Sequence, residues 1–171
     1  NGVMLILRRP WLALDTYLTP RLSGYLPYGE GDGERADLRC GRIPHEYLDQ
    51  ILDHLRAALP NEAAAFVIWN EVTCEFALSF PVIDEATPSR LVYRPPALPS
   101  DWHVVCDAHS HGSGPAFFSR TDDRDDVHST KISLVFGHLS HDSYVMDMRL
   151  CAAGLLLPLT RNPFERERHA I

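Results

Sequence analysis

The sequence has few cysteines and no closely spaced pair of them. The four are Cys40, Cys74, Cys106 and Cys151, and no Cys-x-x-Cys occurs. This excludes a zinc knuckle and a thioredoxin-type redox motif, which both need that spacing. Because Cys74, Cys106 and Cys151 lie in apolar, strand-like runs, we expect them to be buried free thiols. Free thiols are typical of the reducing cytoplasm, where we expect the protein to act.

Long hydrophobic segments are also missing. No apolar run reaches the roughly 18 residues that a membrane-spanning helix requires. The run from Val3 to Leu7 is shorter than the apolar core of a secretory signal, which has about 7–15 residues. We therefore expect neither a membrane partner nor a secretory signal.

Positive charge is in short supply. Lys and Arg total 16 against 23 Asp and Glu, which gives a net charge of −7. This balance argues against a phosphate-binding surface and hence against a nucleic-acid partner. The remaining composition, with 45% hydrophobic and 23% charged residues, is ordinary for a globular protein. A chain of 171 residues is long enough for one domain with a sizeable core.

The character of the chain changes near residue 42. Residues 3–7 predict one strand, whereas residues 23–42 are rich in glycine and charge and predict an exposed loop or linker. We therefore treat residues 1–42 as an N-terminal extension of unknown role and residues 43–171 as the main domain.

The main domain combines helices with strands. Apolar residues recur at helical spacing over residues 44–59, and a second helix is predicted over residues 119–129. Residues 81–100 contain five prolines and predict a stiff insertion. Strands are predicted over residues 63–69, 74–80, 90–94, 102–106, 134–136, 143–148 and 151–159. This order predicts an α/β (α+β) domain with a mixed, mainly antiparallel sheet.

One stretch carries most of the reactive side chains, namely His109, His111, Ser119 and Asp122. An apolar strand precedes it, and side chains at i and i+2 of a strand point the same way, so both histidines should share a face. Ser119 opens the second predicted helix, and Asp122 falls in its first turn. Two imidazoles and one carboxylate, with a fourth position left for water, form the ligand set of a catalytic zinc site.

This pattern resembles the JAMM motif of the JAB/MPN metallopeptidase family, whose four signature positions all match at the family spacing. The resemblance covers residues 43–171 and implies an MPN fold, a zinc cofactor and hydrolysis of amide or isopeptide bonds. It also implies a catalytic glutamate after a helix and at the start of a strand, where Glu62 stands. Glu71, Glu75 and Glu85 compete for the role of base, and position favours Glu62.

Several neighbouring residues have plain structural interpretations. Ser119 is a good helix cap, and in the family a serine there also faces the metal-bound water. Gly112 stands where many members carry proline, which leaves the stiffness of this loop open. Asp107 could orient an imidazole, although a strand-end acid facing water is the simpler expectation. The other polar residues near the motif are expected on the surface: Asp123, Asp125, Asp126, His138 and His141.

Residues 117–123 are most similar to prokaryotic JAB proteins, including those encoded beside ThiF-like (E1-like) activating enzymes and one in the plasmid-associated PRTRC cassette. The resemblance implies cleavage after the C-terminal Gly-Gly of a ubiquitin-like or sulfur-carrier protein. Two alternatives stay open: a non-catalytic MPN scaffold, and a DNA-associated RadC-like protein, which the acidic balance disfavours. A zinc nucleoside deaminase is excluded, because His-x-Glu and Pro-Cys-x-x-Cys are both missing.

Overall fold

The computed structural model describes residues 2–19 and 33–166. The chain divides into two compact units, residues 1–42 and 43–171. None of the helices in the described ranges combines the length and the apolar character that a membrane crossing requires.

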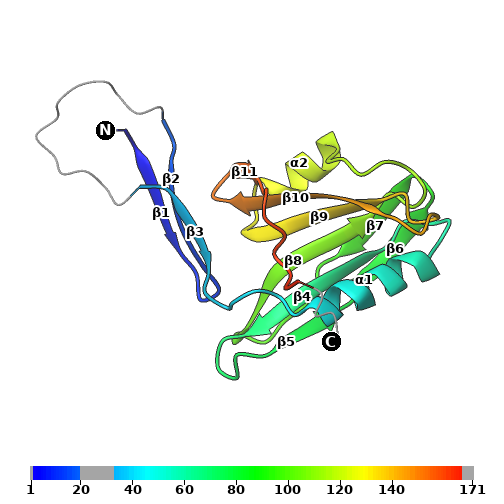
Figure 1. The fold of residues 1–171 in the computed structure, drawn as a ribbon, viewed down its shortest axis with the longest axis horizontal. Coiled ribbons are helices and arrows are strands. Elements are labelled where there is room, and N and C mark those ends of the chain that lie inside the picture. Colours follow the sequence, from blue (N-terminus) through cyan, green and yellow to red (C-terminus); the bar gives the residue numbers. More distant parts are fainter. Residues whose placement is uncertain (1, 20–32, 167–171) are drawn as a thin grey trace, which may run out of the picture. The chain divides into compact units, whose positions relative to one another are not determined.

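The first unit is a three-stranded antiparallel sheet with the order β1-β2-β3 (Figure 1). Its strands are β1 (Met4–Arg8), β2 (Leu12–Tyr17) and β3 (Arg35–Leu38). Asp15 of the central strand pairs with Arg8 at 2.5 Å and with Arg35 at 2.9 Å, so one carboxylate links all three strands.

Only β1 was predicted in this unit. β2 begins two residues after Pro10. The proline does not prevent this strand, since a proline before a strand removes no hydrogen bond from the sheet. β3 lies in the segment that was expected to be a loop, and its pairing with β2 outweighs its polar sequence. Residues 23–32 of that predicted loop lie outside the described residues.

The second unit is built on a six-stranded sheet with the order β11-β10-β9-β8-β4-β5. Its strands are β4 (Ala64–Asn70), β5 (Phe76–Ser79), β8 (Trp102–Ser110), β9 (Lys131–Gly137), β10 (Val145–Ala152) and β11 (Leu155–Pro158). Only β8 and β9 run parallel, and every other neighbouring pair is antiparallel. The predicted mixed, mainly antiparallel α/β architecture is therefore confirmed.

Two helices accompany this sheet. α1 (His45–Ala57) packs against β4 and β8, and it buries a stripe of four apolar side chains. These are Leu48, Ile51, Leu52 and Leu55. α2 (Arg120–Asp126) lies within the connection from β8 to β9, where parallel strands require a crossover.

The proline-rich insertion contains a hairpin. β6 (Val82–Thr87) and β7 (Arg90–Arg94) form a separate two-stranded antiparallel sheet. Only β7 was predicted. β6 is compatible with the prolines because Pro81 precedes it and Pro88 lies in the turn.

Some boundaries and one thiol differ from expectation. β8 continues to Ser110, so His109 lies inside the strand rather than beyond its end. β10 runs unbroken over Val145–Ala152, across the predicted break between the strands 143–148 and 151–159, and β11 forms the later part of the second one after a turn. Cys74 is exposed rather than buried, because it belongs to the β4–β5 turn, where its φ is +58°.

Candidate metal centre

His109 is the most buried of the candidate ligands. It pairs with Ala64 of β4 and Val135 of β9, and only 7% of the residue is exposed. Burial lowers the pKa of its imidazole, and Asp122 opposes that shift, so the ring is neutral near pH 7. Its Nε2 atom is buried without a hydrogen-bond partner among the described residues, and Asp122 Oδ1 lies 3.4 Å away. A buried, unpaired nitrogen costs free energy unless something binds it.

His111 follows the end of β8, and one of its two ring nitrogens is hydrogen-bonded to the backbone. Its Nδ1 lies 3.1 Å from the carbonyl oxygen of Pro115. Because a carbonyl oxygen only accepts, Nδ1 must carry the hydrogen, which leaves the Nε2 lone pair available. The ring of Phe117 packs edge-on against the imidazole at 4.6 Å between centroids. Both contacts fix the orientation of the ring.

Asp122 and Ser119 hold one another in a capping box. The amide of Ser119 donates to Asp122 Oδ2 at 2.6 Å, and the amide of Asp122 donates to Ser119 Oγ at 3.3 Å. One oxygen of Asp122 is therefore used by the helix end, while the other faces His109. The Ser119 hydroxyl accepts in this arrangement, so its own hydrogen is not used by the cap.

The loop that follows His111 is held by its backbone. Gly112 has a φ of +53°, in the left-handed region that proline cannot adopt. The amide of His138 donates to the carbonyl of Gly114 at 2.8 Å. At Gly137, an added Cβ would come within 2.3 Å of the backbone nitrogen of Ala116. The loop after His111 is thus held by its close contact with β9, and a proline at position 112 is not needed to stiffen it.

The structure brings three of the sequence-predicted residues together. One potential ligand atom each from His109, His111 and Asp122 lies within 4.8 Å of the others. No other group of three such residues occurs in the part of the chain that the structure describes. The buried unpaired nitrogen, the available Nε2 of the second imidazole and the inward-facing carboxylate oxygen fit a zinc ion with an open position.

Glu62 lies just before β4 and close to this group. Its amide donates to the carbonyl of Thr87 at 3.0 Å, so the end of β6 fixes its backbone. Burial raises the pKa of its carboxyl group; His111 acts in the opposite direction and Asp122 in the same one. The amide of Ala63, the next residue, donates to Ser110 Oγ at 3.0 Å, so Glu62 lies at the end of β8 that carries the two histidines.

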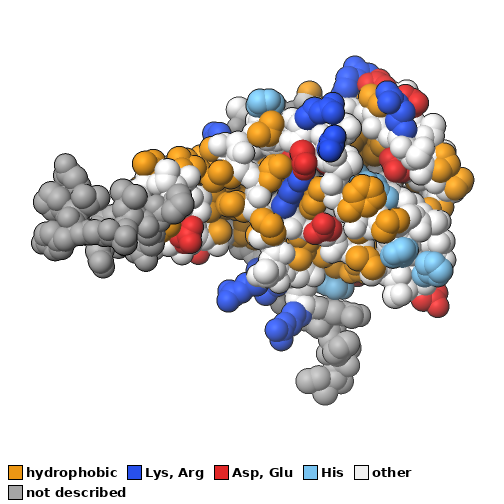
Figure 2. Space-filling model, turned by 90° about the horizontal axis from the view of Figure 1, so that it is seen from above, with side chains coloured by type: hydrophobic (Ala, Val, Ile, Leu, Met, Phe, Trp, Pro, Cys, Tyr) orange, Lys and Arg blue, Asp and Glu red, His pale blue; other side chains and the backbone are white. Residues whose placement is uncertain are grey.

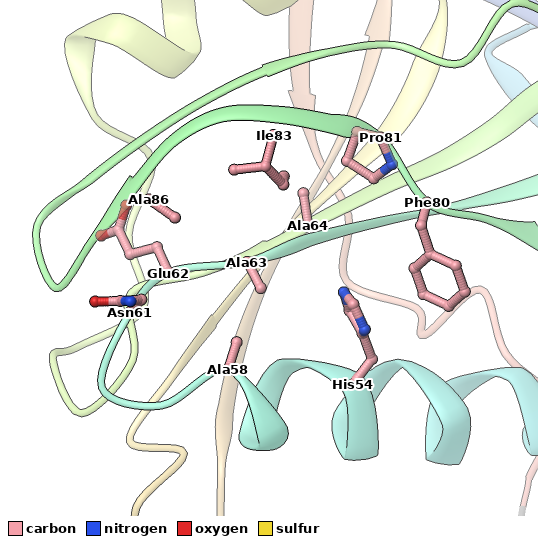
Figure 3. Close-up of a pocket in the computed structure, with 10 residues that line it drawn as sticks. All are labelled: His54, Ala58, Asn61, Glu62, Ala63, Ala64, Phe80, Pro81, Ile83 and Ala86. Atoms are coloured by element: carbon pink, nitrogen blue, oxygen red, sulfur yellow. The ribbon is translucent and has the colours of Figure 1, made fainter.

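A cavity of about 290 Å³ opens beside Glu62. Figure 3 shows it between the end of α1, with His54 and the following Ala58, and the segment that carries Phe80 and Ile83. Glu62 lies at one end of the cavity. A carboxyl group at the mouth of an apolar cavity is suited to carrying a proton, because desolvation favours its neutral form.

The competing glutamates lie elsewhere or have other partners. Glu71 lies 3.0 Å from Nε2 of His103, and Glu85 pairs with Arg90 at 2.8 Å. Glu75 is exposed in the β4–β5 turn. Glu62 therefore remains the candidate base.

The expected exposure of two acids was wrong. Asp107 is 2% exposed, accepts a hydrogen bond from the Tyr93 hydroxyl at 3.1 Å and pairs with Lys131. It neither faces water nor orients an imidazole. Asp126 is also buried, at 3% exposed. Asp123 and Asp125 are exposed as expected, although Asp123 pairs with an arginine.

Two cations explain these buried acids, and sequence reasoning missed both. Lys131 and Arg149 lie on β9 and β10, both C-terminal to the motif. The one available signal was that Lys131 is the only lysine in the chain and opens an apolar strand.

His138 is half-buried and His141 exposed, which agrees broadly with the predicted loop.

Comparison with known proteins gives a consistent family assignment. Residues 44–151 match the Prok-JAB family, described as prokaryotic homologs of the JAB domain, and residues 1–39 match a domain of unknown function, DUF2016. No curated protein matches. The solution structure of protein DSY2949 from Desulfitobacterium hafniense is similar, with 20% identity and a TM-score of 0.45 over 63% of this chain and 82% of that one. The chain belongs to the family of prokaryotic homologs of the JAB domain.

Proposed function

We propose that the protein is a zinc-dependent metallopeptidase or isopeptidase. The observation that carries this proposal is the convergence of three ligand atoms around the buried Nε2 of His109, which lacks a hydrogen-bond partner in the described structure. His109, His111 and Asp122 would hold the ion. When bound, zinc supplies Lewis-acid chemistry, since it acidifies water and polarises a carbonyl group.

Glu62 would act as the general base and then as the general acid. Burial raises its pKa, so this carboxyl group takes up a proton more readily than the carboxyl group of an exposed glutamate. It would take the proton of the attacking water and return it to the leaving nitrogen, so that the amine departs neutral. Such proton transfer contributes roughly 10²–10⁴-fold to the rate.

Ser119 would assist at the carbonyl oxygen. Its Oγ accepts from the Asp122 amide, and its hydroxyl hydrogen remains to be donated. As the carbonyl carbon becomes tetrahedral, charge develops on the oxygen, and a fixed donor stabilises that charge. The capping box supports this role because it fixes the serine without using its hydrogen.

For the substrate, we propose the C-terminal Gly-Gly tail of a ubiquitin-like or sulfur-carrier protein, with a ThiF/E1-like protein as a partner. Among the described residues β7 pairs only with β6, so its second edge offers backbone groups for an extended tail. The face drawn in Figure 2 carries acidic and basic side chains intermixed, which offers no basic patch to a nucleic acid.

Metal analysis tests the first half of the proposal. The purified protein should hold one zinc per chain, and His111→Ala or Asp122→Ala should lose most of it. His141→Ala is the matched control, because this histidine is exposed and lies outside the ligand group. Equal zinc in the wild type and in both ligand variants would contradict the assignment and leave a non-catalytic scaffold.

Hydrolysis tests the second half. A fusion of a ubiquitin-like protein to a reporter through Gly-Gly should be cleaved faster than Ala-Ala and Val-Val versions. Glu62→Gln should keep its zinc but lose about 10²–10⁴-fold in kcat, because the water proton has no acceptor. Loss of zinc in Glu62→Gln would make Glu62 a ligand instead. Equal cleavage of the three fusions would refute the substrate.

A further inference from the structure

A short helix carries one of the three candidate ligands, and little apolar surface holds that helix in place. α2 has seven residues, fewer than the roughly 12–15 that an isolated helix needs for stability. Its one buried residue is an acid, Asp126. The position of Asp122 therefore depends on how this helix is attached to the sheet.

The attachment is ionic. Asp126 Oδ1 lies 2.9 Å from Nζ of Lys131, and Asp126 Oδ2 lies 2.6 Å from Nη2 of Arg149. Arg149 also binds Asp123 through Nη1 at 2.5 Å, and its guanidinium lies 3.8 Å from the ring centroid of Phe118. Because Phe118 directly precedes the capping serine, Arg149 contacts α2 from its start to its last turn.

Lys131 connects α2 to β8, the strand that carries His109. Its ammonium group also pairs with Asp107, whose second oxygen accepts from the Tyr93 hydroxyl. Asp107 precedes His109 by two residues in β8, so both side chains lie on the same face of the sheet. One ammonium group thus joins the strand of His109 to the helix of Asp122.

We propose that Lys131, Asp126 and Arg149 are positioning residues of the metal centre. They hold the free oxygen of Asp122 opposite His109, although none of them would touch the ion or the substrate. The inference rests on the proposed function only in that the three ligands bind zinc. Loss of an outer partner of a metal ligand commonly weakens metal affinity by roughly 10–100-fold.

Asp126→Asn is the informative variant. It preserves volume and leaves each cation one acid, since Lys131 keeps Asp107 and Arg149 keeps Asp123. The protein should therefore still fold. Asp125→Asn is the matched control, because it makes the same chemical change in the same helix at an exposed position.

The readout is zinc affinity, measured by competition with a chelator well below the unfolding temperature. Asp126→Asn should bind zinc roughly 10–100-fold more weakly than wild type, and Asp125→Asn should stay within about twofold. In metal-free protein, the amides of Ser119 and Asp122 should exchange hydrogen faster in Asp126→Asn than in the control. A purely structural role would lower thermal stability without changing zinc affinity in the folded state.

Lys131→Arg and Lys131→Met add a test of rescue. The arginine variant keeps the cation and should retain most of the affinity, whereas the methionine variant should lose it.

Wild-type zinc affinity and wild-type amide exchange in Asp126→Asn would overturn the inference. A protein that binds zinc normally but hydrolyses nothing would refute the proposed activity and leave the positioning role intact. If the wild type bound no zinc, the proposed function would fail and amide exchange alone would decide.

Discussion

At the scale of single residues, two candidate ligands divide their polar atoms between the fold and the site. His111 uses Nδ1 to donate to Pro115, and Asp122 uses Oδ2 to accept from Ser119. The remaining atom of each side chain is thereby oriented. Groups that are oriented before binding lose less conformational freedom when a metal arrives.

Ser119→Ala tests the two roles of the capping serine together. Losing the cap should lower the free energy of unfolding by about 1 kcal/mol, and turnover should also fall because the oxyanion loses a donor. Ser119→Thr keeps both a cap and a hydroxyl and should retain most of the activity. The measurements are urea denaturation and kcat at saturating zinc. An alanine variant that is destabilised but fully active would restrict Ser119 to capping.

The spacing of the motif made the ligand group predictable, whereas the partners of the nearby acids were not. His109, His111 and Asp122 are close in sequence, so local geometry was enough to suggest that they meet. Asp107 and Asp126 instead meet cations of β9 and β10, and the pairing of β8 with β9 and of β9 with β10 brings those cations beside the motif. An acid next to a motif looks solvated until the cation that the folded sheet brings to it is known, and hydropathy carries no information about that pairing.

At the scale of elements, the loop over residues 112–116 is held against the end of β9. An added methyl at Gly137 would collide with the backbone of Ala116, which cannot move away as a flexible side chain would. We expect Gly137→Ala to displace this loop and the Pro115 carbonyl that orients His111. Zinc affinity should fall in Gly137→Ala, measured by chelator competition, with Ser140→Ala as an exposed control nearby. Unchanged affinity would mean that the ring of His111 is oriented without the loop.

The attachment of α2 also predicts a dependence of stability on pH. Burial acts to raise the pKa of Asp126, but Lys131 and Arg149 outweigh it and hold the value below the usual 3.8. A carboxyl group with a depressed folded-state pKa stabilises the protein above its unfolded pKa, and that contribution disappears as the pH falls through the folded value. Each unit of depression corresponds to about 1.4 kcal/mol.

Urea denaturation of metal-free protein checks this. The destabilisation caused by Asp126→Asn should be larger at about pH 6 than at about pH 2, because the contribution of the charge is lost as the pH falls from the unfolded pKa towards the lower folded one. Asp125→Asn should cost little at either pH, because that side chain is exposed. An equal cost of Asp126→Asn at both pH values would show that its charge contributes nothing.

Prediction of the elements succeeded where one strand or helix carries its own signal. α1 was recognised from its apolar stripe and the proline that follows it. β3 was missed because it is short and polar, and β6 because prolines stand just before and after it; both owe their structure to pairing with β2 and β7. Pairing between segments is a tertiary effect that a local reading of polarity and proline does not capture.

At the scale of the whole molecule, the candidate site belongs to one unit alone. Both helices, the six-stranded sheet and all candidate ligands lie within residues 43–171. We therefore expect residues 43–171 produced alone to unfold cooperatively and to bind zinc with wild-type stoichiometry. Circular dichroism melting and metal analysis provide the check. An unfolded product would assign residues 1–42 a structural role, and a folded product without zinc would tie them to the metal centre.

The ionic attachment of α2 also affects which reagents can modify the protein. Lys131 is the only lysine in the sequence, and just 14% of its side chain is exposed. Its pKa is raised, because Asp107 and Asp126 outweigh the effect of burial and keep the amine protonated and unreactive. Amine-directed labels, crosslinkers and conjugating enzymes would find no accessible lysine on the folded protein. An enzyme proposed to cut isopeptide bonds would thus offer almost no side chain on which such a bond could form.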